Sequence, residues 1–241
     1  MIPILPEPSA LLIVSFIGLL ILTIGGAALI AMRYAEGSLA PIGLFFGVWV
    51  LASGLLAASG LAGRWELRPP PALILFVFGF ILAIALSQHP RSRLFARSVP
   101  LALLIGFQAF RFPLELILHR AYVEGMMPVQ MSYTGRNFDI VTGILALIIG
   151  LWGIRRPIAL GVAVIFNLIG LTLLFNIVGI AIVSTPVIQA FGPDHLNLWV
   201  AQLPFIWLPT VFVLIAFLGH LLLMGRLTAE VREKRETKTK S

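Results

Sequence analysis

The sequence predicts an all-α, polytopic membrane protein with seven transmembrane helices, its N-terminus outside and its C-terminus in the cytoplasm. Of its 241 residues, 59% are hydrophobic and 11% are charged, and the mean hydropathy is +1.03. A soluble domain carries about 25% charged residues, so lipid must solvate most of this chain. The charges gather in loops and in a tail, as in membrane proteins. The net charge of +7 is therefore no sign of nucleic-acid binding, and the lipid bilayer is the expected partner.

Seven segments approach the length of about 20 mostly apolar residues that a bilayer-crossing helix needs. The first follows a stretch without Lys or Arg, so we interpret it as a retained helix rather than a signal peptide. Gly, Pro and charged residues separate the segments, and the third and fifth are short. The seven predicted helices are residues 9–32, 39–62, 72–87, 99–122, 138–154, 158–183 and 199–225.

The distribution of basic residues predicts the orientation. With the N-terminus outside, twelve of the 17 Lys and Arg fall in cytoplasmic segments and four in outer segments, a clear positive-inside bias. We therefore expect a transmembrane domain over residues 1–225. Residues 226–241 are expected to form a basic cytoplasmic tail that touches anionic lipid. The location that fits is a cell membrane, the bacterial inner or plasma membrane.

The chain contains no cysteine, which excludes disulfides, thiolate metal sites and cysteine nucleophiles. Small residues are frequent in the first two segments. Gly43 and Gly47 have the GxxxG spacing that lets helix backbones approach closely. This approach can occur within one chain or between copies in a homo-oligomer, and the spacing does not choose between the two.

The fourth predicted helix carries nearly all the ionisable residues of the apolar segments, where such residues are costly and commonly functional. Its polar residues are three, four, four and three positions apart, so they cover an arc of about 80° on one face. That face must meet the bundle or water. A rise of about 1.5 Å per residue places the Arg of this face about 16 Å below the outer end, near the midplane. The polar face consists of Gln108, Arg111, Glu115, His119 and Tyr122.

The outer loop after this helix adds two polar residues. Asn137 or Asp139 can cap the fifth helix, because their side-chain oxygens accept N-terminal backbone N–H groups. We expect either residue to lie at the depth of His119.

The last two helices add further polar candidates. Asn176 lies in the sixth helix, and Asn167, nine residues earlier, points to the opposite side. Gln202 lies near the outer end of the seventh helix. We expect His220 near its inner end, as an interfacial or packing residue.

Three interpretations of the polar face remain open. In the structural one, Arg111 and Glu115 form a buried ion pair one turn apart. In the second, which we prefer, an outward-facing pocket binds or transports a small ligand, an anion or protons. In the third, Glu115, His119 and Asp139 hold a metal such as zinc, and the protein is a hydrolase-like membrane enzyme. The predicted ligand-binding residues are Gln108, Arg111, Glu115, His119, Tyr122, Asn137, Asp139, Asn176 and Gln202.

A local motif adds a resemblance. It consists of an Arg and a Glu followed by Leu-His, then Gly, Pro and Met, and then Gly-x-Asn-Phe-Asp-Ile. The motif residues are Arg111, Glu115, Leu118-His119, Gly125, Pro128, Met131 and Gly135-Arg-Asn-Phe-Asp-Ile140. This motif resembles one found in a family of uncharacterised bacterial multi-pass membrane proteins. The resemblance implies a membrane location and carries no activity with it.

Overall fold

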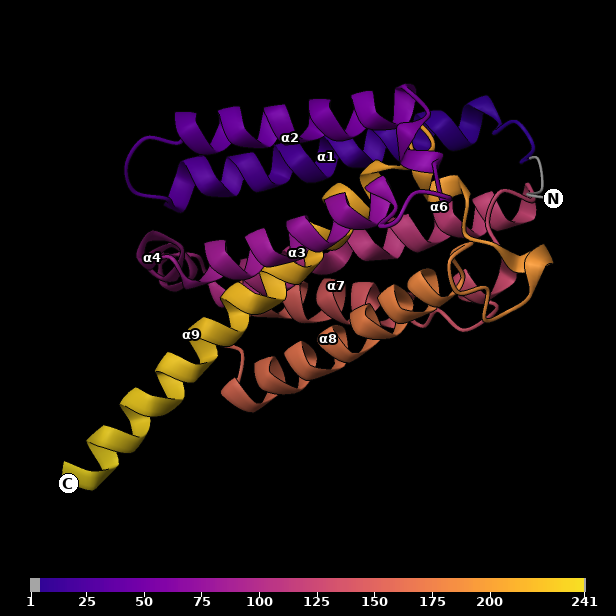
Figure 1. Cartoon of the computed structure of the whole chain (residues 1–241). Coiled ribbons are helices and arrows are strands. Elements are labelled where there is room, and N and C mark those ends of the chain that lie inside the picture. The colour runs from indigo at the N-terminus through magenta and orange to yellow at the C-terminus, as the bar shows by residue number, and fades with distance from the viewer. Residues whose placement is uncertain (1–4, 241) are drawn as a thin grey trace.

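The structure is a computed structural model that describes residues 5–240, and it contains helices and loops with no β-strand in that range. Figure 1 shows most helices side by side in one bundle, with the start of α1 at one end and the end of α9 projecting from the other. Residues 1–4 of the predicted transmembrane domain and residue 241 of the predicted tail lie outside the described residues.

Six helices in residues 5–240 are long and apolar enough to cross a membrane, with mean hydropathies of 1.7 to 2.5. They correspond to six of the seven predicted segments, so the fold is that of a multi-pass membrane protein. The fifth predicted segment forms α7 (Ile140–Arg155), which is apolar but has only 16 residues. The six long helices are α1 (Ala10–Tyr34), α2 (Ala40–Ala58), α3 (Pro71–Gln88), Leu101–Val123, α8 (Leu160–Val183) and Leu208–Thr237.

The first helix is fixed at its start and along one face. The hydroxyl of Ser9 accepts a hydrogen bond from the Leu12 N–H at 3.2 Å, which caps the helix. The buried side chains of Leu12, Phe16 and Leu20 are four residues apart and therefore form one stripe. Phe16 packs edge-on against Phe212, with 5.4 Å between ring centroids. This stripe joins α1 to the bundle core.

The fourth long helix is interrupted near its middle. It consists of α5 (Leu101–Gly106), a 3₁₀ turn (Phe107–Phe110) and α6 (Arg111–Val123). Pro113 has no N–H to donate to the carbonyl of residue 109. The tighter 3₁₀ turn contains residue 109 and ends three residues before this proline, so the interruption has a local sequence cause.

A short helix, α4 (Pro90–Ser98), occupies the region predicted as a basic loop. Proline is favoured at the first helical position, where its missing N–H costs nothing. Arg226 from α9 donates a hydrogen bond through Nη1 to the carbonyl of Ala96 at 3.2 Å and another to that of Val99. These bonds hold α4 against the start of the tail.

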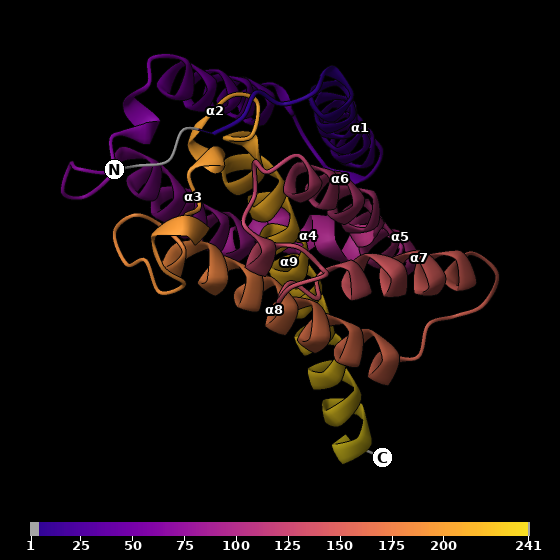
Figure 2. The same cartoon turned by 90° about the vertical axis from the view of Figure 1, so that its right-hand side faces the viewer.

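The last helix, α9 (Val213–Lys240), lies at the centre of the bundle, with α3 and α8 packed against it (Figure 2). One π-helical turn, Leu208–Phe212, precedes α9 and contains Pro209. Such widened turns are frequent at functional sites, and proline can bend a helix. This turn faces the cavity described below.

Glycines bring α7 close to the fourth long helix, against which it packs antiparallel. A Cβ on Gly143 would collide with the backbone nitrogen of Phe112. Gly150 lies against Gly106, where a Cβ on either residue would meet the Cα of the other. Small residues of this kind let membrane helices approach closely. α7 therefore begins beside the start of α6.

The chain between α6 and α7 runs back along α6, and we call residues 124–139 the returning segment. The start of α7 lies beside Arg111, which is about 18 Å along the helix from Val123. The returning segment covers that distance with only one short 3₁₀ turn, Val129–Met131, and buries its methionines in the core. Irregular backbone at membrane depth is tolerated only where protein buries it or it lines an aqueous cavity. We therefore expect the returning segment to contain residues that line a binding site.

Candidate functional site

Arg111 pairs with Asp139 and not with Glu115. Its Nε donates to Asp139 Oδ2 at 2.7 Å, and its Nη2 donates to Oδ1 of the same carboxylate. Both side chains are buried, and Arg111 is only 1% exposed. The predicted ion pair between Arg111 and Glu115 is therefore wrong. The returning segment presents a carboxylate that matches both donors of the guanidinium fork, a stronger arrangement than a single contact.

The same guanidinium contacts a histidine from α9. Arg111 Nη1 donates to His220 Nε2 at 2.8 Å, and His220 Nδ1 lies 2.9 Å from Asn167 Oδ1. Since Nε2 accepts, we assign the ring proton to Nδ1, which donates to Asn167. His220 was expected at the inner interface, but it is fully buried at 0% exposure. Gly170 makes room for it, because a Cβ there would lie 2.6 Å from Nε2.

The sequence placed Asn176, and not Asn167, among the site residues, and the structure reverses this. Asn167 is buried beside His220, whereas Asn176 is exposed and donates to the Arg136 carbonyl at 2.8 Å. The two residues do point in opposite directions, as their spacing predicts. The sequence of α8 does not show which face of this helix is buried, because apolar residues occur on all of its faces.

Glu115 is held by the returning segment. Asn137 Nδ2 donates to Glu115 Oε2 at 2.8 Å and to the Met131 carbonyl at 3.0 Å. Asn137 Oδ1 accepts from the backbone N–H of Asp139 at 3.0 Å. Asp139 occupies the N-cap position of α7 without a side-chain cap bond, because its carboxylate faces Arg111. Asp139 thus lies at the depth of Arg111, deeper than the predicted level of His119.

His119 lies apart from the charged cluster. Its Nδ1 is 3.0 Å from Ser132 Oγ, and its ring stacks on Tyr133 at 4.5 Å and lies 5.7 Å from that of Tyr122. Among the described residues, no group of three or more His, Cys, Asp or Glu side chains could hold a metal ion. The expected set of Glu115, His119 and Asp139 is not assembled, because each side chain has a different partner.

Two further predicted residues also lie apart from a common site. Gln202 is exposed, in the loop before the π-helical turn. Gln108 is buried, and its Nε2 donates to the Ala216 carbonyl at 3.1 Å, one helical turn from His220. Gln108 thus packs below the charged cluster and links the interrupted helix to α9.

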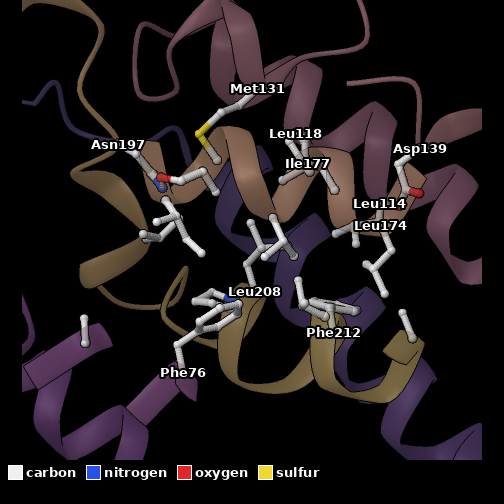
Figure 3. Close-up of a pocket in the computed structure, with 18 of the residues that line it drawn as sticks. Phe76, Leu114, Leu118, Met131, Asp139, Leu174, Ile177, Asn197, Leu208 and Phe212 are labelled. Atoms are coloured by element: carbon white, nitrogen blue, oxygen red, sulfur yellow. Dashed lines mark hydrogen bonds between the residues drawn. The ribbon is translucent and has the colours of Figure 1, made fainter. Parts of the chain in front are cut away.

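A cavity of about 110 Å³ lies between α3, α6, α8 and the π-helical turn. Figure 3 shows Asn197 and Asp139 at opposite ends of it, with Phe76, Leu208 and Phe212 along one wall. Most of its lining is apolar. Its polar lining comes from Arg111, Glu115, Asp139, Thr185 and Asn197. The cavity is therefore elongated and runs from the loop after α8 to the buried ion pair.

Asn197 is a cavity residue that the sequence did not indicate. It is only 2% exposed, and its Nδ2 donates to the Ala181 carbonyl at 3.1 Å. Its Oδ1 is buried without a hydrogen-bond partner in the described chain. An isolated Asn in a loop carries no periodic signal, so only the fold brings it to the cavity.

The fold and the site together define a multi-pass helical membrane protein with a buried charged cluster beside an elongated cavity. A family model matches residues 69–228, and the chain belongs to that family, which is described as a domain of unknown function (DUF8737). The matched region contains α3 to the start of the tail, and with them the whole charged cluster. No curated protein and no solved structure matches the chain.

Proposed function

We propose that this protein binds a small ligand in the cavity and transports it across the cell membrane. The observation that carries the proposal is the position of Glu115. Glu115 lines the cavity, is 2% exposed and forms no ion pair among residues 5–240. Since Asp139 already neutralises Arg111, a carboxylate at Glu115 needs a proton or a cation from the cavity.

The proposed orientation has seven membrane crossings, with α7 as a short one, the N-terminus outside and the C-terminus in the cytoplasm. The start of α1 and the end of α9 lie at opposite ends of the bundle, in keeping with an odd number of crossings (Figure 1). Basic α4 and the basic tail lie together through Arg226. In this orientation both face the cytoplasm, which agrees with the positive-inside rule, and the Asn197 end of the cavity faces outward.

The broken helices support transport over passive binding. α7 is preceded by irregular backbone, and a π-helical turn precedes α9. Interrupted helices that meet near the bilayer midplane form the substrate sites of many transporters. An anion is a poorer fit than a neutral or cationic ligand, because the guanidinium of Arg111 is already bound to Asp139. No contact in the described residues favours the metal-enzyme alternative.

The natural absence of cysteine makes the orientation directly testable. We would introduce Glu66→Cys in the loop before α3 and, separately, Ser92→Cys in α4, and treat intact cells with a membrane-impermeant maleimide. Labelling of Glu66→Cys alone is the expected result, with Ser92→Cys labelled only after lysis. The opposite pattern would invert the proposed topology.

Binding in the cavity can be tested by filling the cavity with a larger side chain. Ile177 lines the cavity on α8, whereas Leu168 on the same helix is 58% exposed. We would screen small molecules for thermal stabilisation of the protein in nanodiscs, and then measure uptake of each hit in proteoliposomes. Ile177→Trp should abolish stabilisation and uptake, and the matched Leu168→Trp should keep both. Hits that stabilise both variants equally would show that the cavity is not the binding site.

A further inference from the structure

We propose that the ligand of the cavity is an apolar amine, bound as a cation with its ammonium group at Glu115. This inference deepens the proposed function and rests on it. The ligand also carries a second N–H or O–H donor for Asn197, at the other end of the cavity. The argument combines the hydrogen-bonding state of the polar lining, its charge and the character of the walls.

Asn197, Thr185 and Arg111, three of the polar residues that line the cavity, donate hydrogen bonds to protein. Asn197 Nδ2 donates to a carbonyl, which fixes the orientation of its amide, and Thr185 Oγ1 donates to the Ile182 carbonyl at 2.7 Å. Arg111 directs its three nitrogens to Asp139 and to a histidine. The groups that Asn197 and Glu115 leave open are acceptors. A ligand that satisfies them must therefore supply donors.

Glu115 provides the strongest open acceptor. Its Oε2 accepts from Asn137, while no hydrogen bond to its Oε1 occurs in the part of the chain that the structure describes. Arg111 and Asp139 cancel each other, so the cluster has one negative charge in excess whenever Glu115 is ionised. A protonated amine supplies both the missing donor and the missing positive charge, and such charge-assisted hydrogen bonds are the strong ones.

The apolar cavity walls favour a ligand whose remaining part, apart from the ammonium group, is apolar. Phe76, Phe110 and Phe212 line the cavity, and the faces of aromatic rings attract cations. A carboxylate or phosphate ligand would meet the open acceptor oxygens of Glu115 and Asn197 and would be repelled by the first when it is ionised. The apolar walls also disfavour strongly hydrated ions such as Na⁺, which would lose their water without gaining enough ligands.

Three probes with one apolar body separate the ligand classes: 4-phenylbutylamine, 4-phenylbutanol and 4-phenylbutyrate. We would measure their binding to the full-length protein in nanodiscs by calorimetry at neutral pH. The amine should bind at least tenfold more tightly than the alcohol, and the carboxylate should bind most weakly. Glu115→Gln should reduce amine affinity at least tenfold and change alcohol affinity less than threefold. The matched variant Glu124→Gln, outside the cavity, should bind the amine as the wild type does.

The outcomes separate this inference from the proposed function. If the alcohol or the carboxylate binds more tightly than the amine, and Ile177→Trp blocks it, the amine class is overturned and the cavity remains a binding site. If amine affinity is unchanged in Glu115→Gln, the assigned ammonium position is overturned. Should Glu115→Gln fail to fold, loss of amine binding in Ile177→Trp, with retention in Leu168→Trp, tests the site. Equal binding to those two variants means partition into lipid and overturns both proposals.

Discussion

Arg111 and Asp139 lie 28 residues apart in the chain, yet they form a two-point ion pair in the middle of the bundle, with Nε to Oδ2 at 2.7 Å. The pair joins the start of α6 to the start of α7 and holds the inner end of the returning segment. Both residues also line the cavity. The stability of the bundle and the charge of the site therefore depend on the same contact.

Removing the charge of Asp139 should destabilise the fold strongly. Asp139→Asn deprives the buried guanidinium of Arg111 of the carboxylate that is hydrogen-bonded to it, and breaking a buried pair costs about 3–5 kcal/mol. The free energy of unfolding, measured by SDS titration in mixed micelles, should fall by that amount. The double variant Arg111→Gln/Asp139→Asn should recover part of the loss, because it also removes the guanidinium that the single variant leaves unpaired. A double variant less stable than the single one would contradict this account.

Glu115→Gln should behave differently from Asp139→Asn in the same unfolding assay. A glutamine keeps an acceptor for Asn137 Nδ2 and removes no partner of Arg111, so stability should change by no more than about 1 kcal/mol. A loss as large as that of Asp139→Asn would instead support an ion pair between Arg111 and Glu115.

Gly143→Ala should destabilise the contact between α6 and α7. The added Cβ would lie 2.9 Å from the carbonyl carbon of Arg111, and backbone cannot move aside as a flexible side chain can. Overpacking of this kind costs about 1–3 kcal/mol. Gly161→Ala is the matched control, because nothing lies within 4 Å of a Cβ there. Thermal unfolding of the two variants should rank Gly143→Ala clearly below Gly161→Ala.

Acid should weaken the attachment of α1 to the end of α6. Glu124 accepts hydrogen bonds from Ser9 Oγ at 2.5 Å and from the Ser9 backbone N–H at 2.8 Å. These bonds, together with Arg120, hold the pKa of Glu124 below its ordinary value of 4.5. A lowered folded-state pKa gives stabilisation that is complete above about pH 4.5 and is lost as the pH falls through the lowered pKa.

This pH dependence can be measured by difference. The melting temperature of the wild type should exceed that of Glu124→Gln near pH 6, and the two should converge toward pH 3. Glu7→Gln, an exposed carboxyl in the segment before α1, serves as the matched control. A difference between wild type and Glu124→Gln that grows on acidification would contradict the assignment.

Local periodicity predicted what lies on one helix. The spacing of Arg111, Glu115 and Gln108 placed them on one face of the fourth helix, and all three are buried. The partner of Arg111 could not be predicted, because the path of the returning segment depends on packing. His220 was misplaced for a related reason. The level of a residue in a bundle follows from where its neighbours begin and end, and hydropathy does not report this.

The cavity could not be predicted from the sequence, for a different reason. An apolar wall and an apolar helix contact look alike in sequence, so Phe76 and Phe212 gave no sign that they face a cavity. Asn197 reaches the cavity only because the loop after α8 folds back over the bundle. The sequence therefore indicated the polar helix face at the charged end of the cavity and gave no indication of the shape of the cavity.

The returning segment also constrains how the protein can be made. A helix with Arg111 at its centre is a poor membrane segment by itself, and α7 begins with a carboxylate at the same depth. Each becomes compatible with lipid only when the other is present. The two should therefore leave the insertion machinery as a helical hairpin. A nascent chain that ends before residue 139 would hold Arg111 in the bilayer without the carboxylate to which it is hydrogen-bonded in the folded protein.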